Sequence, residues 1–569
     1  MNDPLPQTPE DFLKVTWDQL EPSAHQLLEQ SLKATNLVAW LTDWSDLSRA
    51  ISETYQRRYV ASTVDTSNPS ALQQYQAYVD EIQPPWMAVE QKLKEKLLAS
   101  GFEPPALDIP LRNMRAGTDL FRESNLPLLG EEMKLNNEYD QVIGTQTVNW
   151  EGSEVTLTRL LPVNQEHDRN RRELAWKLAA GRRLADRQAL NDLWSRLMSL
   201  RTQIAVNAGK PDYRAYRWQQ MLRFDYTPQD CIRFQEAIEE VIVPVANRLY
   251  QKRRQKLGLE TLRPWDLEVD LFDQEPLHPY QDSDELVGKT EAIFSEVDPQ
   301  LGKYFAILRR EGLLDLDNRK SKAPGAYCTN YDTSRLPFIF MNGVGLQDDV
   351  MTLLHEGGHA FHVFEIAHLP YHCQLDVGLE FAEVASTSME FLCAPFLDQE
   401  AIGFYSKQQA ARARLAHLEQ MITFWPYMAV VDAFQHWAYE NPSAARLPEN
   451  CDAAWADLCG RFMPGVDWSG LEDALKTGWQ RKLHIFEEPF YYVEYGLAQL
   501  GAVQVWRNAL ADRPRAVADY RRALSLGGTV PLPQLFATAG ARLAFDAGIL
   551  REAVSLIEQT MSDLEASLV

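Results

Sequence analysis

Cysteine and long apolar segments are scarce in this sequence, and each shortage excludes a class of protein. The 569 residues include six cysteines without a CxxC pair, which argues against a disulfide framework and against a cysteine zinc site. No segment approaches the roughly 20 consecutive apolar residues that a membrane-spanning helix needs. The first twenty residues have neither the basic start nor the apolar core of an export signal. We therefore expect a cytoplasmic protein.

Positive charge is also in short supply. Lysine and arginine total 56 against 80 aspartates and glutamates, which gives a formal net charge of −24. This field repels phosphate backbones and anionic lipids, so we expect neither nucleic acid nor a membrane surface as a partner. Basic stretches such as Arg169, Arg171 and Arg172 stand among acids, and we expect them to form a solvated helix face. The sequence does not indicate the oligomeric state.

Helical periodicity dominates the rest of the sequence. Apolar residues recur at three- and four-residue spacing between charges in three clear segments, 86–100, 185–207 and 228–257. Within 140–161, β-branched residues alternate around Glu151-Gly152 instead, which predicts a hairpin. The apolar run from Phe338 to Met341 predicts a strand. A chain of 569 residues exceeds the size at which one core keeps growing, so two lobes are expected.

One predicted helix, over 348–365, carries the clearest chemical motif. His355, Glu356 and His359 form the pattern H-E-x-x-H. Residues four apart lie on one helix face, so both imidazoles can bind one zinc ion. Glu356 projects in an adjoining direction, where it can accept a proton from a water that the metal activates. Glycines follow at 357 and 358, each costing about 1 kcal/mol relative to alanine, which indicates that other elements approach closely.

The third metal ligand must come from elsewhere in the chain. A metzincin would have glycine at 362 and histidine at 365, but this chain has His362 and Glu365, which excludes that class. The next acid-rich segment, 378–395, also reads as a helix. It offers Glu380, Glu383 and Glu390. Helical phase places the last two on one face, and the residues alone leave the choice of ligand open.

The segments LLHEGGHAFH and EFAEVASTSMEFL together resemble the oligoendopeptidase F branch of the thimet oligopeptidase (M3) family of zinc metallopeptidases. The resemblance implies a mainly α-helical, two-lobed, neurolysin-like zincin fold with a deep central channel and one Zn²⁺ per chain. It assigns Glu383, in A-E-V-A-S, as the third ligand beside His355 and His359. Glu390 then becomes an acid that orients a ligand imidazole.

The resemblance extends in both directions from the metal motif. Upstream, GAYCTNYDTSRLPFIFMN is similar to the stretch that leads into the family's metal helix. It implies that the strand Phe338–Asn342 runs along the cleft and pairs with the backbone of a bound peptide. Weaker likeness reaches LRPWDL at 262–267 and DRNRREL at 168–174.

Downstream, HIFEEPFYYVEYGLAQL at 484–500 is similar to a histidine and tyrosine cluster of the family. On one continuous helix, Tyr491 or Tyr492 would share a face with Tyr495, two turns after His484. Such donors near the metal can stabilise an oxyanion by about 3 kcal/mol each. The resemblance implies His484, Tyr495 and one of the two adjacent tyrosines, of which we favour Tyr492. The glycine-rich loop of the thimet branch is missing here, so the register is open by one residue.

These observations predict a zinc-dependent endopeptidase that hydrolyses internal bonds of short peptides. We expect an N-terminal helical lobe over 1–200, with the hairpin near 140–161, and a catalytic lobe over 201–569. One alternative is a zinc carboxypeptidase or dipeptidase, which needs a cation for the free carboxylate, such as Arg335 or Arg481. Another is a non-catalytic peptide-binding protein with a structural zinc, in which Glu356 would be dispensable.

Overall fold

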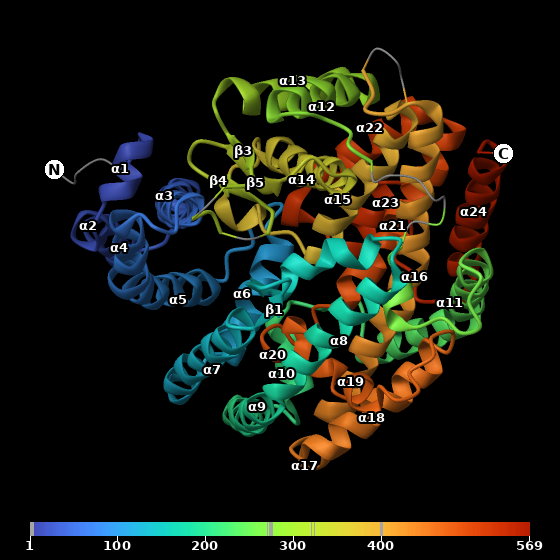
Figure 1. Ribbon diagram of the computed structural model, residues 1–569. Coiled ribbons are helices and arrows are strands. Elements are labelled where there is room, and N and C mark those ends of the chain that lie inside the picture. The colour runs from blue at the N-terminus through green and yellow to red at the C-terminus, as the bar shows by residue number, and fades with distance from the viewer. Residues whose placement is uncertain are drawn as a thin grey trace.

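Helices make up most of the chain, as the periodicity predicts (Figure 1). The computed structural model describes residues 5–269, 271, 277–319, 321–323, 325–398 and 402–568. None of the helices in these ranges is long and apolar enough to cross a membrane. The strands form two small sheets within this two-lobed helical fold.

The first half of the chain consists of helices interrupted by one hairpin. The N-terminal helices are α1 (Pro9–Lys14), α2 (Trp17–Glu29), α3 (Leu37–Val64), α4 (Pro69–Ala77), α5 (Gln83–Ser100) and α6 (Asp108–Leu120). They are followed by α7 (Leu126–Gly144), β1 (Thr147–Trp150), β2 (Ser153–Thr156), α8 (Arg169–Ala185), α9 (Arg187–Asn207), α10 (Tyr213–Gln220) and α11 (Pro228–Lys256). Helices α5, α9 and α11 confirm the three periodic segments.

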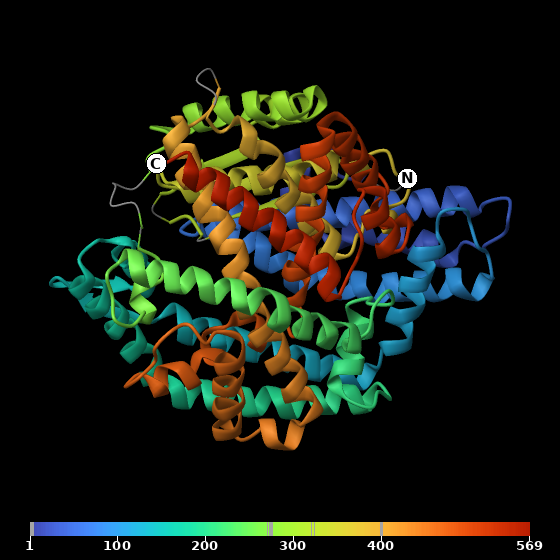
Figure 2. The same ribbon diagram turned by 90° about the vertical axis from the view of Figure 1, so that its right-hand side faces the viewer.

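The second half contains the larger sheet and the longest helix. Its first elements are α12 (Ser283–Val297), α13 (Pro299–Arg310), β3 (Leu314–Asp317), β4 (Tyr327–Tyr331), β5 (Leu336–Gly343), α14 (Gln347–Ile366) and α15 (Leu379–Cys393). The remaining helices are α16 (Lys407–Glu440), α17 (Pro442–Ala445), α18 (Pro448–Phe462), α19 (Glu472–Lys476), α20 (Leu483–Phe486), α21 (Val493–Ala511), α22 (Arg513–Leu524), α23 (Leu532–Thr538) and α24 (Ala547–Ala566). The final helix, α24, packs along α11 and α16 (Figure 2).

The predicted hairpin is confirmed as β1 and β2. Val148 lies opposite Val155, and Trp150 opposite Ser153. The two turn residues, Glu151 and Gly152, have φ values of 51° and 84°. Positive φ at both central positions is the geometry of the tight turn that matches the twist of paired strands.

The larger sheet has the strand order β3-β5-β4, and this order corrects the expectation about peptide pairing. The predicted strand Phe338–Met341 lies within β5. This strand pairs with β3 in parallel and with β4 antiparallel, so both of its edges are occupied. In the described part of the chain β4 pairs with β5 alone. The two edge strands of this sheet are therefore β3 and β4, rather than the strand that the sequence indicated.

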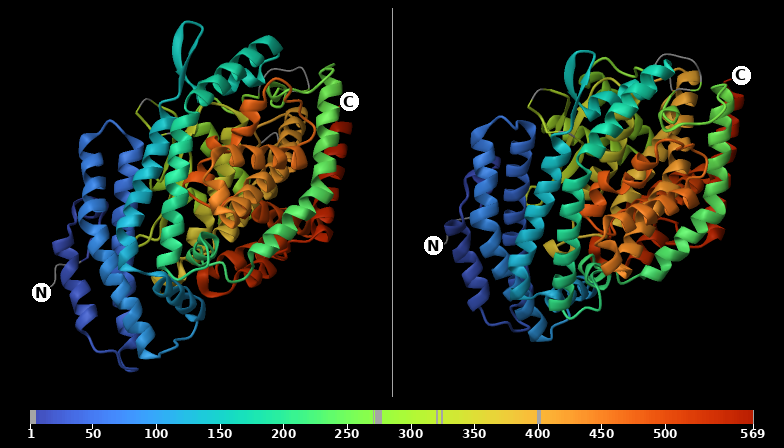
Figure 3. Two further views of the ribbon diagram at one scale, coloured as in Figure 1. Left: turned by 90° about the horizontal axis from the view of Figure 1, so that it is seen from below. Right: turned by 60° about the horizontal axis from the view of Figure 1, so that its bottom comes forward.

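Two of the apolar clusters in the described residues are large. One is built from side chains between Val15 and Met114, in the layer of helices that forms one side of the molecule (Figure 3). The other runs from Val60 to Met561 and includes side chains of α7 and α9. The predicted division near residue 200 stays a prediction, and α6 contributes to both clusters, with Met114 in the first and Leu120 in the second.

The basic stretch on α8 is not a fully solvated face as expected. Arg172 is 2% exposed, and its Nη2 donates to Oδ1 of the fully buried Asp266 at 3.0 Å. Arg169 donates to both oxygens of the same carboxylate, at 2.9 and 2.8 Å. The contact joins DRNRREL to LRPWDL, so these two segments of family likeness form one buried ion-pair network.

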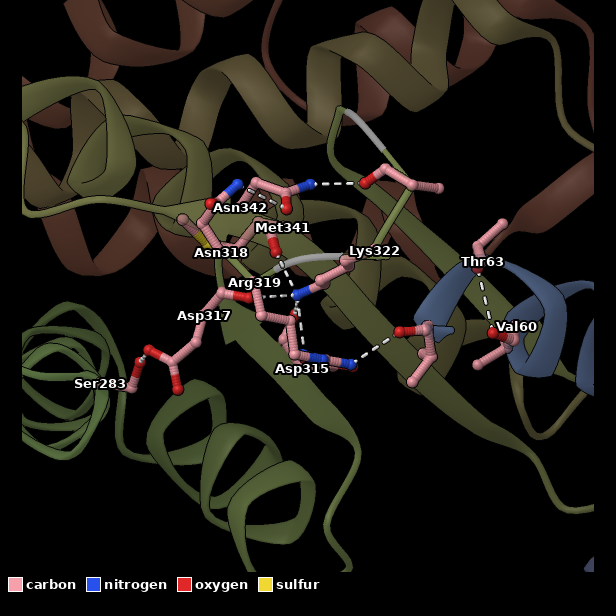
Figure 4. A network of polar contacts seen from close by, with 12 residues as sticks. Val60, Thr63, Ser283, Asp315, Asp317, Asn318, Arg319, Lys322, Met341 and Asn342 are labelled. Carbon is pink, nitrogen blue, oxygen red and sulfur yellow. Dashed lines mark hydrogen bonds and ion pairs between the residues drawn. The ribbon is translucent and has the colours of Figure 1, made fainter. Parts of the chain in front are cut away.

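A lysine holds the connection between β3 and β4 against the sheet (Figure 4). The side chain of Lys322 is 0% exposed, and its Nζ donates to the Asp315 carboxylate at 2.8 Å. The same ammonium donates to the carbonyl oxygens of Asp317 at 2.8 Å and Met341 at 2.5 Å. Arg319 also pairs with Asp315 and reaches the carbonyl of Val64 on α3 at 2.9 Å. This network fixes the sheet relative to α3.

Candidate active site

The H-E-x-x-H helix, α14, begins at a carboxylate that caps it. Oδ2 of the buried Asp349 accepts from the backbone N–H groups of Val344 and Leu346, both at 2.8 Å, and from the Tyr280 hydroxyl at 2.5 Å. A carboxylate suits this end of a helix because the first N–H groups are unpaired and the helix dipole is positive there. The cap sets where α14 starts, and therefore which face carries His355 and His359.

The two glycines of the motif mark close approaches, as predicted. A Cβ at Gly358 would lie 2.6 Å from both the Ala385 carbonyl oxygen and the Ser386 Cα on α15. A Cβ at Gly357 would lie 2.5 Å from the ring of Phe294. Because no side chain separates α14 from α15 at Gly358, the backbones of these helices are in direct contact beside the motif.

This contact brings Glu383 of α15 to the two histidines of α14. Nε2 of His355 lies 3.3 Å from Glu383 Oε2, and Nε2 of His359 lies 3.8 Å from the same oxygen. One donor atom from each residue lies within 4.8 Å of the other two. Two imidazole nitrogens and a carboxylate oxygen that converge in this way fit the donor set of a catalytic zinc site.

Glu390 lies behind the histidine pair and contacts His355 from the other side of its ring. Its Oε1 is 2.7 Å from His355 Nδ1, and its Oε2 is 2.7 Å from His417 Nε2 on α16. Burial raises the pKa of Glu390. The hydrogen bonds from both histidines outweigh this effect and lower the pKa to about 2. Glu390 is therefore ionised and holds Nδ1 of His355 as a donor, which leaves Nε2 free to bind a metal.

Glu356 lies next to the donor set in a nearly dry position. The residue is 7% exposed, and its Oε2 has no hydrogen-bond partner among the described residues. Burial raises the pKa of Glu356 to about 7, against the opposing effect of His355. The backbone N–H of Cys328 on β4 also donates to this carboxylate. A carboxyl group with this pKa can both accept and release a proton near neutral pH.

The histidine and tyrosine cluster is assembled differently from the prediction. His484 lies on α20, whereas α21 begins at Val493, so one continuous helix through 484–500 is wrong. Phe490, after Pro489, has a φ of 68°, which no helix accommodates. The chain folds back between α20 and α21, and this nonetheless brings the rings together. The ring centroid of His484 lies 5.8 Å from that of Tyr495 and 4.9 Å from that of Tyr492.

The two adjacent tyrosines have different surroundings. The Tyr492 ring lies under Lys482, with Nζ 4.1 Å from its centroid, and packs against Phe424. By contrast, the negative charge of Glu383 contributes to the raised pKa values of both Tyr491 and Tyr495, after the larger effect of burial. Tyr491 therefore shares the electrostatic environment of the donor set with Tyr495, whereas Tyr492, the residue that the sequence favoured, contacts Lys482 and Phe424 as well as His484 and Tyr495.

A cavity of about 1000 Å³ opens onto the donor set. Its walls come from α3, α5, α6, β4, α14 and α15, and Tyr495 contributes from α21. The edge strand β4 lines it with Tyr327, Cys328 and Thr329. The N-terminal helices thus supply one wall of the site.

The remaining candidates lie around this centre. Glu380 accepts the Tyr226 hydroxyl at 2.6 Å and is not among the three clustered metal donors. His362 is 6% exposed, and burial lowers its pKa to about 4. Arg335 lies in the β4–β5 turn with a φ of 55°, and its charge acts on Arg49. Arg481 lies beside Lys482, close to His484 in the chain, and its charge adds to the effect of burial in lowering the pKa of Lys482.

A second group of possible metal donors, Cys231, Asp432 and His436, is fully buried. Nη1 of Arg214 lies 3.2 Å from His436 Nδ1. An arginine can only donate, so Nδ1 carries the lone pair and Nε2 carries the proton. Since Nε2 is the ring nitrogen that faces Asp432, this group does not offer a free imidazole donor to a metal.

A two-lobed helical fold in which an H-E-x-x-H helix meets a glutamate from the next long helix is that of the helical metallopeptidases. The chain belongs to peptidase family M3, whose sequence model matches residues 163–555. A second model, the peptidase M3 N-terminal domain, matches residues 9–106.

Curated relatives and solved structures agree with this assignment. An oligoendopeptidase F homolog of Lactococcus lactis is 25% identical over 64% of this chain and 60% of its own length. The oligopeptidase PepF of Bacillus subtilis is 23% identical over 57% of this chain and 48% of its own length. The chain thus matches less than two-thirds of the length of these relatives. The structure of PZ peptidase A with an inhibitor has a TM-score of 0.88, is 28% identical, and covers 97% of this chain and 98% of its own.

Proposed function

We propose that this protein is a zinc-dependent endopeptidase that cleaves internal bonds of short peptides. One observation carries the proposal: His355, His359 and Glu383 converge on one point, with the partly unpartnered carboxylate of Glu356 beside them, on the wall of a cavity. The names of the relatives, oligoendopeptidase F and oligopeptidase, support the same substrate class.

His355, His359 and Glu383 would hold the metal. Zinc fits this set because it prefers imidazole nitrogen and carboxylate oxygen, and three protein ligands are typical of its catalytic sites. A bound zinc supplies a Lewis acid for the scissile carbonyl and for the attacking water. Glu390 fixes the ring orientation of His355, and Ser386 donates to Glu383 at 3.1 Å.

Glu356 would move the proton during hydrolysis. It accepts a proton from the attacking water and delivers it to the nitrogen of the leaving amine. Burial keeps the carboxylate basic enough for this purpose, because it outweighs the opposing effects of His355 and of the Cys328 backbone donor on the pKa.

Tyr495, Tyr491 and His484 would stabilise the oxyanion that develops on the carbonyl oxygen. Burial, followed by the charge of Lys482, lowers the pKa of His484 to about 4. The ring is therefore neutral at pH 7 and donates through one N–H. Burial raises the pKa of Tyr495 to about 12, so its hydroxyl also remains a donor.

The edge strand β4 would bind the peptide backbone. Its residues line the cavity next to Glu356, and its side away from β5 pairs with no strand in the described residues. An extended peptide that adds to this edge would place its backbone in register with the donor set. The cavity admits an extended chain more readily than a folded protein, which agrees with short peptides as substrates.

Cleavage of an end-blocked fluorogenic nonapeptide tests the proposal. The wild type should cut an internal bond when it carries one zinc per chain. Glu356→Gln, at matched zinc content, should lose several orders of magnitude in kcat, whereas Glu291→Gln on α12, which pairs with Arg309 and does not line the cavity, should retain the wild-type rate. A chelator should abolish the activity, and added zinc should restore it. Cleavage of unblocked peptides alone would favour the carboxypeptidase alternative, and full activity in Glu356→Gln would reject the mechanism.

A further inference from the structure

A side pocket of about 340 Å³ opens from the main cavity beside the metal donors, and we propose that it binds a lysine or arginine side chain of the substrate peptide through Asp376. The inference rests on the proposed function, because it names which peptides the same site prefers. The other cation that a peptide carries is its N-terminal ammonium, which experiment can distinguish from a side chain.

The side pocket and the main cavity are continuous. The residues that line both are Asn113, Leu222, Asp376, Val377 and Leu379. Helix α15 begins at this shared rim, and its residue Glu380 lines the side pocket about one helical turn before the metal donor Glu383. Tyr491 also lines the side pocket, and its ring centroid lies 5.2 Å from that of Tyr495 in the main cavity. A peptide residue close to the scissile bond can therefore direct its side chain into the side pocket.

The charged residues that line the side pocket leave an excess of carboxylates. Each arginine among them has a carboxylate partner: Arg112 pairs with Asp225 at 3.5 Å, Arg217 with Glu488 at 2.5 Å and Arg223 with Glu494 at 2.5 Å. Two further carboxylates, those of Glu380 and Asp376, also line the pocket. Glu380 lies 3.8 Å from Arg223, whereas the Asp376 carboxylate has no ion-pair or hydrogen-bond partner among the described residues. The lining is therefore negatively charged, which favours a cationic ligand.

The side pocket also contains a buried acceptor without a donor. Glu494 is 2% exposed, and its Oε2 has no hydrogen-bond partner in the part of the chain that the structure describes. Its Oε1 accepts from Arg223, whose guanidinium lies 4.6 Å from the centroid of the Trp218 ring. That ring partly compensates the two nitrogens of Arg223 that lack an acceptor. The free oxygen of Glu494 has no such compensation, and an ammonium or guanidinium supplies the missing donor.

Much of the remaining wall of the side pocket is apolar. Phe224 and Leu379 line it, and they are 42% and 44% exposed although they are large apolar residues. Met221, Leu532 and Leu535 add further apolar lining. A lysine or arginine side chain has an apolar stem and a cationic head, so it matches both the apolar wall and the carboxylates. An N-terminal ammonium has no such stem, and the pocket therefore favours a basic side chain.

The backbone of Asp376 is held at the rim by direct packing. A Cβ at Gly528 would lie 2.0 Å from the Asp376 carbonyl oxygen, and a Cβ at Gly527 would lie 2.6 Å from the Gln374 carbonyl oxygen. The segment before α15 thus rests directly on the connection between α22 and α23. Because this backbone is fixed while Asp376 itself is exposed, a ligand can bind its carboxylate at a low cost in ordering.

Pairs of end-blocked nonapeptides with arginine or citrulline test this inference, since citrulline has nearly the same shape without the charge. Each pair places this residue at one of the two positions on either side of the cleaved bond, which mass spectrometry identifies. We expect the wild type to cleave the arginine peptide of at least one pair with a kcat/KM about tenfold higher, the effect of one charge-assisted contact. Asp376→Asn should reduce that ratio to about one without changing cleavage of the citrulline peptide, and Asp376→Glu should restore most of it. Asp192→Asn, which removes the same charge from an exposed position on α9, is the matched control and should retain the full ratio.

The outcomes separate this inference from the proposed function. Equal cleavage within every pair by the wild type would overturn the inference and leave the endopeptidase proposal intact. An arginine preference that persists in Asp376→Asn would overturn it as well. A citrulline peptide with a free N-terminus tests the other cation. A gain from the free amine that depends on Asp376, with none from arginine, would assign the pocket to the N-terminus and reject the side-chain assignment.

A binding measurement covers the case in which no peptide is cleaved. Fluorescent arginine and citrulline peptides are titrated into zinc-loaded Glu356→Gln. The arginine peptide of at least one pair should bind about tenfold more tightly, and Asp376→Asn in that background should remove the difference. Equal Kd values in every pair would reject the inference in that case.

Discussion

Glu390 lies between two histidines and contacts both at the same distance: its oxygens are 2.7 Å from His355 Nδ1 and 2.7 Å from His417 Nε2. The first contact orients a metal-binding imidazole, and the second ties the carboxylate to α16. The position of His355 therefore depends on three helices, α14, α15 and α16.

Replacing Glu390 should weaken metal binding without removing a ligand. We expect Glu390→Gln to lower zinc affinity about 10- to 100-fold, because the imidazole loses the acceptor that fixes its orientation and basicity. Competition with a chromophoric chelator measures the change. His417→Phe should have a smaller effect in the same direction, and Glu131→Gln, on the exposed face of α7, should have none. Unchanged affinity in Glu390→Gln would show that His355 is oriented by its packing alone.

We expect Tyr491 and Tyr495 to stabilise the oxyanion and Tyr492 to have no such role. We expect Tyr495→Phe and Tyr491→Phe each to lower kcat about 100-fold or more, with little change in KM, because the lost donor acts in the transition state. Tyr492→Phe should change kcat by less than tenfold. Steady-state kinetics on one end-blocked peptide compares all three. A larger loss in Tyr492→Phe than in Tyr491→Phe would restore the original assignment from the sequence.

Gly358→Ala should damage the metal site through the backbone. The added Cβ would meet the Ala385 carbonyl at 2.6 Å, so α14 and α15 must separate and carry Glu383 away from the histidines. We expect a lower thermal midpoint together with at least tenfold weaker zinc binding. Gly460→Ala on α18, where nothing lies within 4 Å of the new Cβ, is the matched control. It should leave zinc binding unchanged and raise stability slightly.

Lys322→Met should destabilise the sheet (Figure 4). The buried ammonium serves one carboxylate and the carbonyls of Asp317 and Met341, and methionine leaves these acceptors without their donor. We expect a loss of about 3 kcal/mol in the free energy of unfolding. Thermal unfolding followed by circular dichroism measures the shift, with the exposed Lys303→Met as control. An unchanged midpoint would mean that water replaces the ammonium at these acceptors.

Residues close together in the sequence were the ones that could be predicted. The i, i+4 spacing of His355 and His359 follows from helix geometry, and alternation around Glu151-Gly152 follows from strand geometry. Glu383 required the family resemblance, since Glu380 and Glu390 are equally acidic.

Contacts between distant segments left no signal in the sequence. His417 joins the site from α16, and nothing near it resembles a ligand motif. The break between α20 and α21 depends on the positive φ of Phe490. Arg223 stabilises this conformation by donating a hydrogen bond to the Phe490 carbonyl oxygen at 2.6 Å. The strand order of the larger sheet is likewise a tertiary property, and this is why the sequence indicated β5 where the structure exposes β4.

The position of β4 has a consequence for how the protein avoids aggregation. A free strand edge on an open surface offers unpaired N–H and C=O groups to the sheets of other proteins. Here α3 packs against β4, where the Tyr327 hydroxyl and Thr63 Oγ1 are 2.6 Å apart, and the exposed length faces the cavity. A second sheet cannot approach an edge enclosed in this way, whereas a single extended chain can. The enclosure therefore protects the protein from intermolecular sheet growth while it keeps an unpaired strand available throughout its lifetime.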